Sequence, residues 1–334
     1  MHPPDAKPYP LRFHPLLKQT IWGGRRLGEK LGKPLGASDD YAESWELVDH
    51  RSDQSVVQNG ELEGLSLQEL IRRASPWLLG KQAGGSDSDD HTSFPLLLKY
   101  LDCNRVLSVQ VHPDDEYGAQ MTPPDLGKTE AWFVVDADPE SVIYAGLKTG
   151  VDRATLAEAV EAGQTEQVLH TFHPSPGDCV FIPAGTVHAL GAGLLIAEIQ
   201  QSSNTTFRLF DWNRLGSDGQ ARPLHIQQSL DVTDFSRGPV HPSVTDRSAE
   251  GWQSLVNCDK FCLRALCQGV GSIGGDGQFH ILTVPIGSAL IREPGGQQEQ
   301  LLQVGETVLL PAAMEACEVV PSENAVVLAM AGPR

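Results

Sequence analysis

Short apolar runs separated by turn residues are the feature of this chain that most restricts its fold. The last quarter of the chain contains a series of them, at 261–266, 279–285, 288–292, 306–310 and 325–329. Each run has the length of a β-strand and is too short for a typical helix. The 33 glycines and 23 prolines of the chain favour turns and interrupt helices. We therefore predict a mainly β fold of two β-barrels or jelly rolls, decorated by a few helices.

Three segments carry helical signals, at 65–79, 152–168 and 225–232. In the first, Ser66 precedes the apolar positions and Glu69 follows three residues later, which is the pattern of an N-terminal capping box. In the second, Asp152 stands where an N-cap residue is expected. The segments are short and far apart, so we expect them to lie against the β core.

An internal repeat indicates two related units. PGDCVFIPAGTVHAL, which begins at 176, aligns with VGETVLLPAAMEACE, which begins at 304, and the alignment places Gly177 on Gly305. It also places Ala316 on His188, so the second unit lacks this histidine. The shared pattern is also a common entry into a strand, and this alternative stays open. Residues 236–250, rich in Pro, Ser and charge, separate the copies, so we predict domains over 1–240 and 250–334.

Side chains that suit a metal ion lie at separated positions. Apolar and polar residues alternate between 107 and 112, so Ser108, Gln110 and His112 share one face of a strand. Glu130 opens an apolar run, and His188 follows a Pro-x-Gly bend. Two imidazoles, a carboxylate and an amide oxygen form a donor set for a divalent metal such as zinc. The fold must then bring together four donors: Gln110, His112, Glu130 and His188.

Each donor also has a simpler interpretation. An exposed edge strand would show the same alternation, with Gln110 and His112 in water. Glu130 can be a solvated residue at a strand start, and His188 can be a packed or surface histidine. These interpretations are linked, because a metal site requires all four donors in one place.

Two cationic residues lie in otherwise apolar runs, where an unpaired charge is costly. Arg208 lies within TFRLFDW and needs either a carboxylate such as Asp211 or an anionic ligand as its partner. Lys99 lies within FPLLLKYL, where its ammonium can also reach solvent from a strand end. A cationic pocket would be needed by any anionic ligand, because the formal net charge of the chain is −18.

This acidic surface also restricts the partners of the protein. It repels the phosphates of nucleic acids and of anionic membranes. No apolar run approaches the roughly 18 residues that span a bilayer, and the first residues lack the apolar core of a signal peptide. We expect a cytoplasmic protein with reduced cysteines that binds neither nucleic acid nor membranes.

Four longer motifs follow one another along the chain: SVQVHPDD, GKTEAWFVVD, FIPAGTVHAL and AEIQQSSNTTFRLFDWNR. IWGG at 21–24 and ESWE at 43–46 precede them. Together they resemble the type I mannose-6-phosphate isomerases of the cupin superfamily, in their short bacterial form. The resemblance extends from about Pro15 to Phe235 and continues more weakly to the C-terminus. It is partial in the second cupin motif, where Ala192 replaces the usual asparagine.

The resemblance implies two cupin-like barrels, with residues 1–240 as the catalytic domain and 250–334 as a metal-free domain. It implies an aldose-ketose isomerase that interconverts D-mannose 6-phosphate and D-fructose 6-phosphate through a cis-enediol. The implied ligands of Zn²⁺ are Gln110, His112, Glu130 and His188. The implied substrate-binding residues are Ser108, Lys99, Lys128 and Arg208.

In such a reaction negative charge develops on O1 and O2 of the sugar, and fixed positive charge must stabilise it. The resemblance assigns this role to Arg208, together with the metal as a Lewis acid. A base must also move the proton between C2 and C1. Glu198, Lys128 and a metal-bound water stay open as that base, and the expected catalytic side chains are Arg208, Lys128 and Glu198.

Other functions stay open at this point. An Fe(II) dioxygenase would also use two histidines and a carboxylate, but it has no use for Gln110 or for several cationic residues. A non-catalytic cupin that binds sugar phosphates would turn nothing over, and an isomerase with another sugar preference would keep the whole site. We expect a monomer, with an oligomer as the open alternative, and a small sugar phosphate as the partner.

Overall fold

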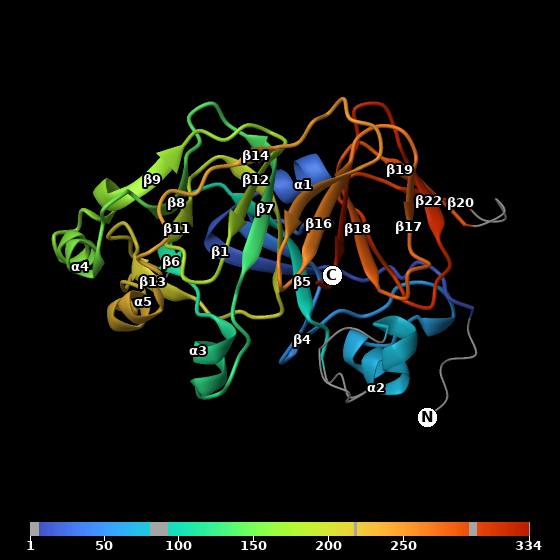
Figure 1. Ribbon diagram of the computed structural model, residues 1–334, viewed down its shortest axis with the longest axis horizontal. Coiled ribbons are helices and arrows are strands. Elements are labelled where there is room, and N and C mark those ends of the chain that lie inside the picture. The colour runs from blue at the N-terminus through green and yellow to red at the C-terminus, as the bar shows by residue number, and fades with distance from the viewer. Residues whose placement is uncertain (1–6, 81–92, 217–218, 294–298, 334) are drawn as a thin grey trace.

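The computed structural model describes residues 7–80, 93–216, 219–293 and 299–333, and β-sheets dominate it (Figure 1). Neighbouring strands within each sheet are antiparallel. The prediction of a mainly β fold with a few helices is confirmed.

The N-terminal part forms two large sheets. The first has seven strands in the order β1 (Leu16–Gly24), β2 (Tyr41–Leu47), β5 (Leu96–Cys103), β12 (Leu194–Gln201), β7 (Glu130–Ala137), β10 (Asp178–Ile182) and β14 (Ser243–Val244). The second has five strands in the order β13 (Phe207–Phe210), β6 (Val109–Val111), β11 (His188–Leu190), β8 (Ile143–Leu147) and β9 (Leu169–Phe172). A ribbon follows β2, formed by β3 (Asp49–His50) and β4 (Asp53–Gln54). The two large sheets face each other across a core that contains Trp132, Ile143 and Ile196.

The C-terminal part forms two further sheets. One has five strands in the order β15 (Trp252–Asn257), β16 (Cys262–Leu266), β23 (Val326–Ala331), β18 (His280–Ile286) and β21 (Thr307–Leu310). The other has four strands in the order β17 (Gly271–Ile273), β22 (Cys317–Pro321), β19 (Ala289–Arg292) and β20 (Glu299–Leu302). Leu282, Ile291 and Val327 lie in the core between these sheets. The five apolar runs of the sequence all form strands here.

The two parts of the chain repeat one strand order. The strands β2, β5, β12, β7 and β10 correspond in sequence and in space to β15, β16, β23, β18 and β21. Gly177 precedes β10 and Gly305 precedes β21, and their φ angles are 100° and 78°. Glycine adopts such angles without strain, so the same kind of turn enters the same strand in both parts.

The paired sheets are open rather than closed. Among the described residues, the edge strands of each pair are not hydrogen-bonded to each other. Closing a sheet into a barrel requires that last pairing. Each part is therefore a two-sheet jelly roll, which is the second of the two forms that the sequence predicts.

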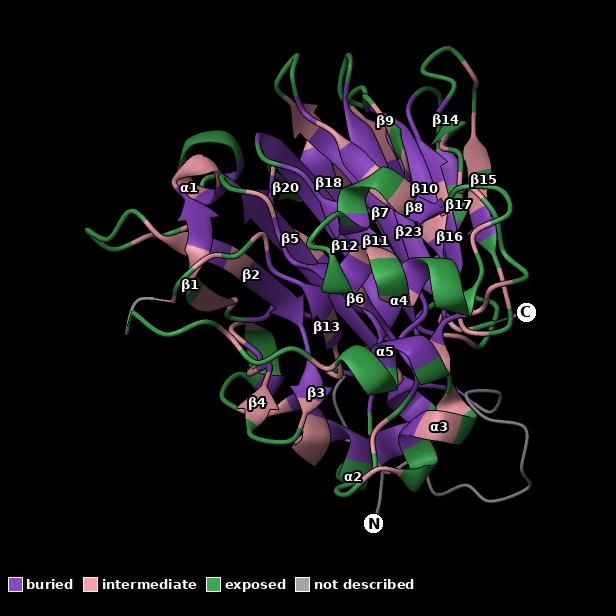
Figure 2. Cartoon of the chain, turned by 90° about the vertical axis from the view of Figure 1, so that its left-hand side faces the viewer, coloured by how far each residue is buried: buried purple, intermediate pink, exposed green. Residues whose placement is uncertain are grey.

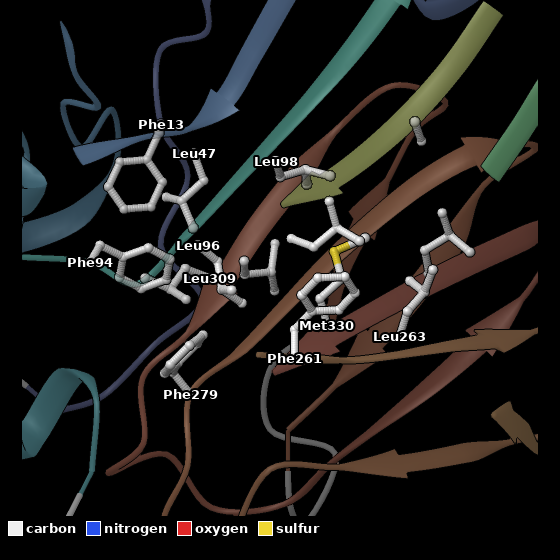
Figure 3. Packing of buried hydrophobic residues seen from close by; sticks show 14 of the residues in the cluster. Phe13, Leu47, Phe94, Leu96, Leu98, Phe261, Leu263, Phe279, Leu309 and Met330 are labelled. Carbon is white, nitrogen blue, oxygen red and sulfur yellow. The ribbon is translucent and has the colours of Figure 1, made fainter. Parts of the chain in front are cut away.

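The central strands of the seven-stranded sheet are buried on both faces. Leu98 and Tyr100 of β5 pack in one core with Leu263 and Met330 of the C-terminal part, as Figure 3 shows for several members of this core. Lys99 points to the opposite face, because successive side chains of a strand alternate. This explains why an almost wholly apolar run carries one charge. Because the two parts share this core, the boundary between domains at 240–250 stays a prediction.

The first predicted helix is present as α2 (Leu67–Leu78). Ser66 and Glu69 exchange hydrogen bonds there in the predicted capping box. The short helices α1 (Arg26–Leu31) and α3 (Asp115–Gln120) and the 3₁₀ turn η1 (Gly60–Leu62) are absent from the prediction. None of them exceeds six residues, which is too short for helical periodicity to be visible in the sequence.

The other two predicted helices cover the outer face of the five-stranded N-terminal sheet, and their outward sides are exposed (Figure 2). α4 (Arg153–Glu161) begins at the predicted cap Asp152 but is shorter than expected. Gly163, with a φ of 67°, ends it, and the 3₁₀ turn η2 (Thr165–Val168) follows. α5 (Ile226–Val232) matches its prediction. No helix within the described residues is long and apolar enough to cross a membrane.

Candidate metal centre

Two paired strands and one facing strand bring the predicted ligands together. Gln110 lies in β6, and its register partner is His188, the first residue of β11. His112 follows the end of β6, and Glu130 is the first residue of β7 in the facing sheet. One nitrogen or oxygen atom from each of His112, Glu130 and His188 lies within 4.8 Å of the others.

Both imidazoles are held in the tautomer that places the lone pair on Nε2. His112 Nδ1 donates to the carbonyl oxygen of Thr205 (3.0 Å), and His188 Nδ1 donates to that of Thr186 (2.9 Å). A carbonyl only accepts hydrogen bonds, so each Nδ1 carries the proton and each Nε2 presents a lone pair. Histidines that bind metals are commonly fixed in this way.

Each histidine lies near a different oxygen of Glu130, at a distance close to that between two ligands of one metal ion. His112 Nε2 lies 3.5 Å from Glu130 Oε2, and His188 Nε2 lies 3.4 Å from Glu130 Oε1. Donors about 2.1 Å from a tetrahedral metal are about 3.4 Å apart. Glu130 Oε1 is buried and has no hydrogen-bond partner among the described residues. The residues therefore fit a divalent cation.

Burial keeps the imidazoles in the neutral form that binds metals. Burial, together with the charge of Lys128, lowers the pKa of His112 well below its usual value and lowers that of His188 to about 3. Burial and the nearby Glu198 raise the pKa of Glu130 to about 7. A cation bound at Glu130 would favour the carboxylate and lower that pKa.

Gln110 reaches the same place, although its nitrogen points inward. Gln110 Nε2 lies 3.3 Å from His188 Nε2. A half turn of the amide would put its oxygen, the atom that can bind a metal, in the position of the nitrogen. Ser108 lies two residues earlier along the chain and is also buried.

Lys128 is the cation nearest to the ligands. Its Nζ lies 2.9 Å from His112 Nε2 and contacts Glu130 Oε2 directly. It is also 3.8 Å from Glu198 Oε1. Lys128, predicted from the sequence as a catalytic and substrate-binding residue, is therefore buried beside two candidate metal ligands and the carboxylate of Glu198. The acidic neighbours balance its charge.

Lys99 and Glu198 form a buried ion pair beside this group. Lys99 Nζ lies 3.0 Å from Glu198 Oε1 and 3.3 Å from Glu43 Oε2. Trp132 Nε1 donates to Glu198 Oε2 (3.1 Å). Burial would raise the pKa of Glu198, but Lys99 and Lys128 outweigh it and lower that pKa. Glu198 is thus an ionised carboxylate at neutral pH.

Arg208 differs from the lysines because it has no carboxylate partner among the described residues. It is the register partner of Gln110, so both side chains leave their strands on the same face. Its Nη1 donates to a backbone carbonyl (3.0 Å), while its Nε is buried without a partner. Asp211, the alternative partner considered from the sequence, instead binds Arg214 (2.5 Å) and Arg222 (2.6 Å).

The sequence motifs miss the groups that support the predicted residues. The carbonyls of Thr186 and Thr205 orient the histidines, and Glu43 balances Lys99. The ESWE motif contains Glu43, but nothing in the motif indicates that Glu43 pairs with Lys99. A carbonyl gives no signal in the sequence, because every residue has one.

Asp125 accepts a hydrogen bond from the side chain of Thr205, whose carbonyl orients His112. Replacement of Asp125 is expected to destabilise the protein in a pH-dependent way. Burial would raise the pKa of Asp125, but hydrogen bonds from His50 and Thr205 outweigh it and lower that pKa to about 2. The folded state then favours the carboxylate more than the unfolded state does. We expect D125N to lose about 1–2 kcal/mol of unfolding free energy near pH 7.

The difference between D125N and the wild type should shrink as the pH falls from about 4 towards 2, because protonation removes the advantage of the carboxylate. Urea unfolding at several pH values measures it. Asp39, whose side chain is 89% exposed, gives the matched control D39N. An equal loss for D125N at pH 3 and pH 7 would contradict the explanation.

Comparisons with known proteins identify relatives of this chain. The family model described as phosphomannose isomerase type I, catalytic domain, matches residues 11–141. Mannose-6-phosphate isomerase ManA of Bacillus subtilis (strain 168) is 34% identical over 305 residues, which cover 90% of this chain and 93% of that protein. The mannose-6-phosphate isomerase of Streptococcus mutans serotype c (strain ATCC 700610 / UA159) is 33% identical over 308 residues, 92% of this chain and 94% of that protein.

A solved structure extends the match to three dimensions. The crystal structure of the mannose 6-phosphate isomerase from Bacillus subtilis superposes with a TM-score of 0.84 at 29% identity, and the match covers 96% of this chain and 99% of that one. The match therefore includes both jelly rolls. On the strength of these relatives over nearly its whole length, the chain belongs to the type I phosphomannose isomerase family.

Proposed function

We propose that this protein is a zinc-dependent mannose-6-phosphate isomerase that interconverts D-mannose 6-phosphate and D-fructose 6-phosphate through a cis-enediol. The observation that carries the proposal is an arginine without a carboxylate partner, Arg208, on the same sheet face as Gln110 at a cluster of metal donors. Relatives that cover at least 90% of the chain are named for this activity.

The donor set supports a bound metal of the zinc type. The ligands would be Gln110, His112, Glu130 and His188. Zn²⁺ bound by these residues would supply a Lewis acid for negative charge on the sugar oxygens. Neutral imidazoles with the lone pair on Nε2, and a buried carboxylate oxygen without a hydrogen-bond partner among the described residues, support this assignment.

Arg208 is suited to the charge that the reaction creates. The C2 proton leaves the aldose and a proton returns to C1, while the hydroxyl proton moves from O2 to O1. Negative charge grows on O1 and O2 during both transfers. The charges of Lys99 and Lys128 are balanced by glutamates, whereas that of Arg208 is not. An anionic substrate is therefore met chiefly by Arg208, with Ser108, Lys99 and Lys128 as further binding residues.

Glu198 is the stronger of the two side-chain candidates for the base. Its carboxylate is ionised and can therefore accept a proton. Trp132 and Lys99 hold its two oxygens, which fixes the position of the carboxylate. We propose that Lys128, at 3.8 Å from Glu198, exchanges protons with the sugar oxygens.

Chelation is expected to abolish the activity. The purified protein should carry one zinc per chain and convert mannose 6-phosphate to fructose 6-phosphate in a coupled assay. Removal of the metal should lower kcat by more than about 100-fold, because a main source of charge stabilisation is lost. Added Zn²⁺ should restore the rate.

The same measurements separate the alternatives. Oxygen consumption that depends on Fe(II) would indicate a dioxygenase. Binding of mannose 6-phosphate without turnover would indicate a non-catalytic sugar-phosphate protein, and faster turnover of another sugar phosphate would indicate a shifted preference. Undiminished isomerisation in the metal-free protein would contradict the metal role altogether.

A further inference from the structure

We propose that the C-terminal jelly roll positions the segment that carries Lys128 and Glu130, through a contact between Lys260 and Asp115. Asp115 and Gln201 are the positioning residues, and Lys260 is the residue of the C-terminal part that holds Asp115. The inference rests on the proposed function, because it assigns a role in that reaction to a jelly roll that has no ligand cluster of its own among the described residues.

Asp115 links two elements of the metal centre. It is the first residue of α3, three positions after His112. Its Oδ1 accepts hydrogen bonds from the backbone N–H of Gly127 (2.8 Å) and from Nε2 of Gln201 (2.8 Å). The carboxylate therefore ties the start of the 127–130 segment to both α3 and β12.

Gln201 continues the link on the other side of Lys128. Its Oε1 accepts a hydrogen bond from the backbone N–H of Thr129 (3.0 Å), and its own N–H donates to Thr129 O (3.2 Å). Hydrogen bonds thus fix the backbone immediately before and after Lys128. Because Glu130 follows Thr129 directly, the same bonds set the position of this ligand.

The segment has little room to move independently of α3. A side chain at Gly127 would place its Cβ 2.5 Å from the backbone of Asp114 and Asp115. The backbone N–H of Lys128 also donates to Pro113 O (2.9 Å). A shift of Asp115 is therefore transmitted to the 127–130 segment, because close-packed atoms must move together.

Lys260 makes the contact from the C-terminal part. It lies in the turn between β15 and β16, and its Nζ lies 2.9 Å from Asp115 Oδ2. The second oxygen of Asp115 is thereby held while the first binds Gly127 and Gln201. Phe261, the next residue, is buried in the core that joins the two parts of the chain, so the turn is anchored.

The contact lies beside a cleft of about 900 Å³, whose lining includes Asp115, Thr129, Gln201 and Lys260. The side chains of Lys260 and Asp115 are 28% and 42% exposed. Partly exposed ion pairs contribute modestly, which corresponds to about a two- to fivefold effect. The hydrogen bonds that Asp115 accepts are more buried, so its removal should have the larger effect.

The test compares D115A, D115N, K260M and the double variant D115A/K260M with the wild type. We expect D115A to lower kcat and to raise the dissociation constant for Zn²⁺ about tenfold each, at the lower end of the effect of groups that orient ligands. Hydrogen exchange at the amides of Gly127 and Thr129 should accelerate in D115A, while the thermal midpoint stays within about 2 °C of the wild type. K260M should shift all three quantities in the same direction, about two- to fivefold.

Two variants separate positioning from general destabilisation. K260R keeps the ion pair and should restore wild-type kcat and exchange. R292Q breaks the exposed pair of Arg292 with Glu299 in the same jelly roll and should change neither.

The double variant should be no worse than D115A, because Lys260 acts through Asp115. D115N keeps an acceptor for Gly127 but loses the charge, and it decides the matter if D115A does not fold.

Wild-type exchange at Gly127 and Thr129 in D115A, or effects of D115A and K260M that multiply in the double variant, would overturn the inference. Failure of the proposed function looks different. In that case the wild type would not isomerise mannose 6-phosphate, while hydrogen exchange and zinc affinity would still report on the link between Lys260 and the 127–130 segment.

Discussion

Replacement of Arg208 by alanine is expected to lower kcat about 10²- to 10³-fold while the metal stays bound. This is the usual effect of removing a fixed group that stabilises developing charge in a water-poor site. Arg208 has no carboxylate partner among the described residues and shares a sheet face with Gln110. The positive charge of its guanidinium is therefore available to the sugar oxygens. In the alanine variant, only the metal would stabilise the negative charge that develops on them.

The variant R208A is measured by steady-state kinetics and by metal content on the same sample. R208K should recover part of the rate, because it keeps the positive charge but not the planar fork of donors. R73A, which removes an exposed arginine of α2, should behave as the wild type. An unchanged kcat in R208A would remove Arg208 from the mechanism, and loss of metal would make its role structural.

Replacement of His112 by alanine is expected to remove metal and activity together. Changing a group that merely orients a ligand weakens metal binding about 10- to 100-fold, and loss of the ligand itself costs more. His112 is buried, and its Nε2 lies 3.5 Å from Glu130 Oε2. Without it, the donor cluster of His112, Glu130 and His188 loses one of its two nitrogens.

Zinc per chain after dialysis against a chelator measures this loss directly. Zinc should raise the thermal midpoint of the wild type but not that of H112A, because a ligand that binds only the folded state stabilises it. The matched control is H14A, since His14 is exposed. Full occupancy in H112A would refute the assignment of His112 as a ligand.

Much of the candidate site could be predicted because its signals are local. The alternation around Gln110 describes a strand whose apolar neighbours pack beneath α4 and α5. The Pro-x-Gly bend before His188 is present, with Gly185 at a φ of 84° and its N–H bonded to the carbonyl of His112 (2.9 Å). Turn chemistry and side-chain alternation depend on neighbouring residues, so they can be read along the chain.

The partners of charged residues could not be predicted in the same way. The sequence leaves Arg208 with Asp211 as a possible partner, yet Arg214 and Arg222 bind that carboxylate. Lys99 could have been a solvated lysine at a strand end, yet it is buried against Glu43 and Glu198. The pairing of Lys99 depends on strands that are distant in sequence, whereas Asp211 binds arginines three and eleven residues further along the chain.

From the sequence alone came the mainly β class, five of the strands in the C-terminal part and the set of candidate donors at Gln110, His112, Glu130 and His188. Only the tertiary structure decided that the sheets stay open, which histidine nitrogens face the candidate ion, and that Lys260 contacts Asp115. The physical reason is the separation along the chain of the residues on which each property depends. Strand periodicity is a property of neighbours, whereas the free energy of a buried charge depends on groups that only folding brings within a few ångströms.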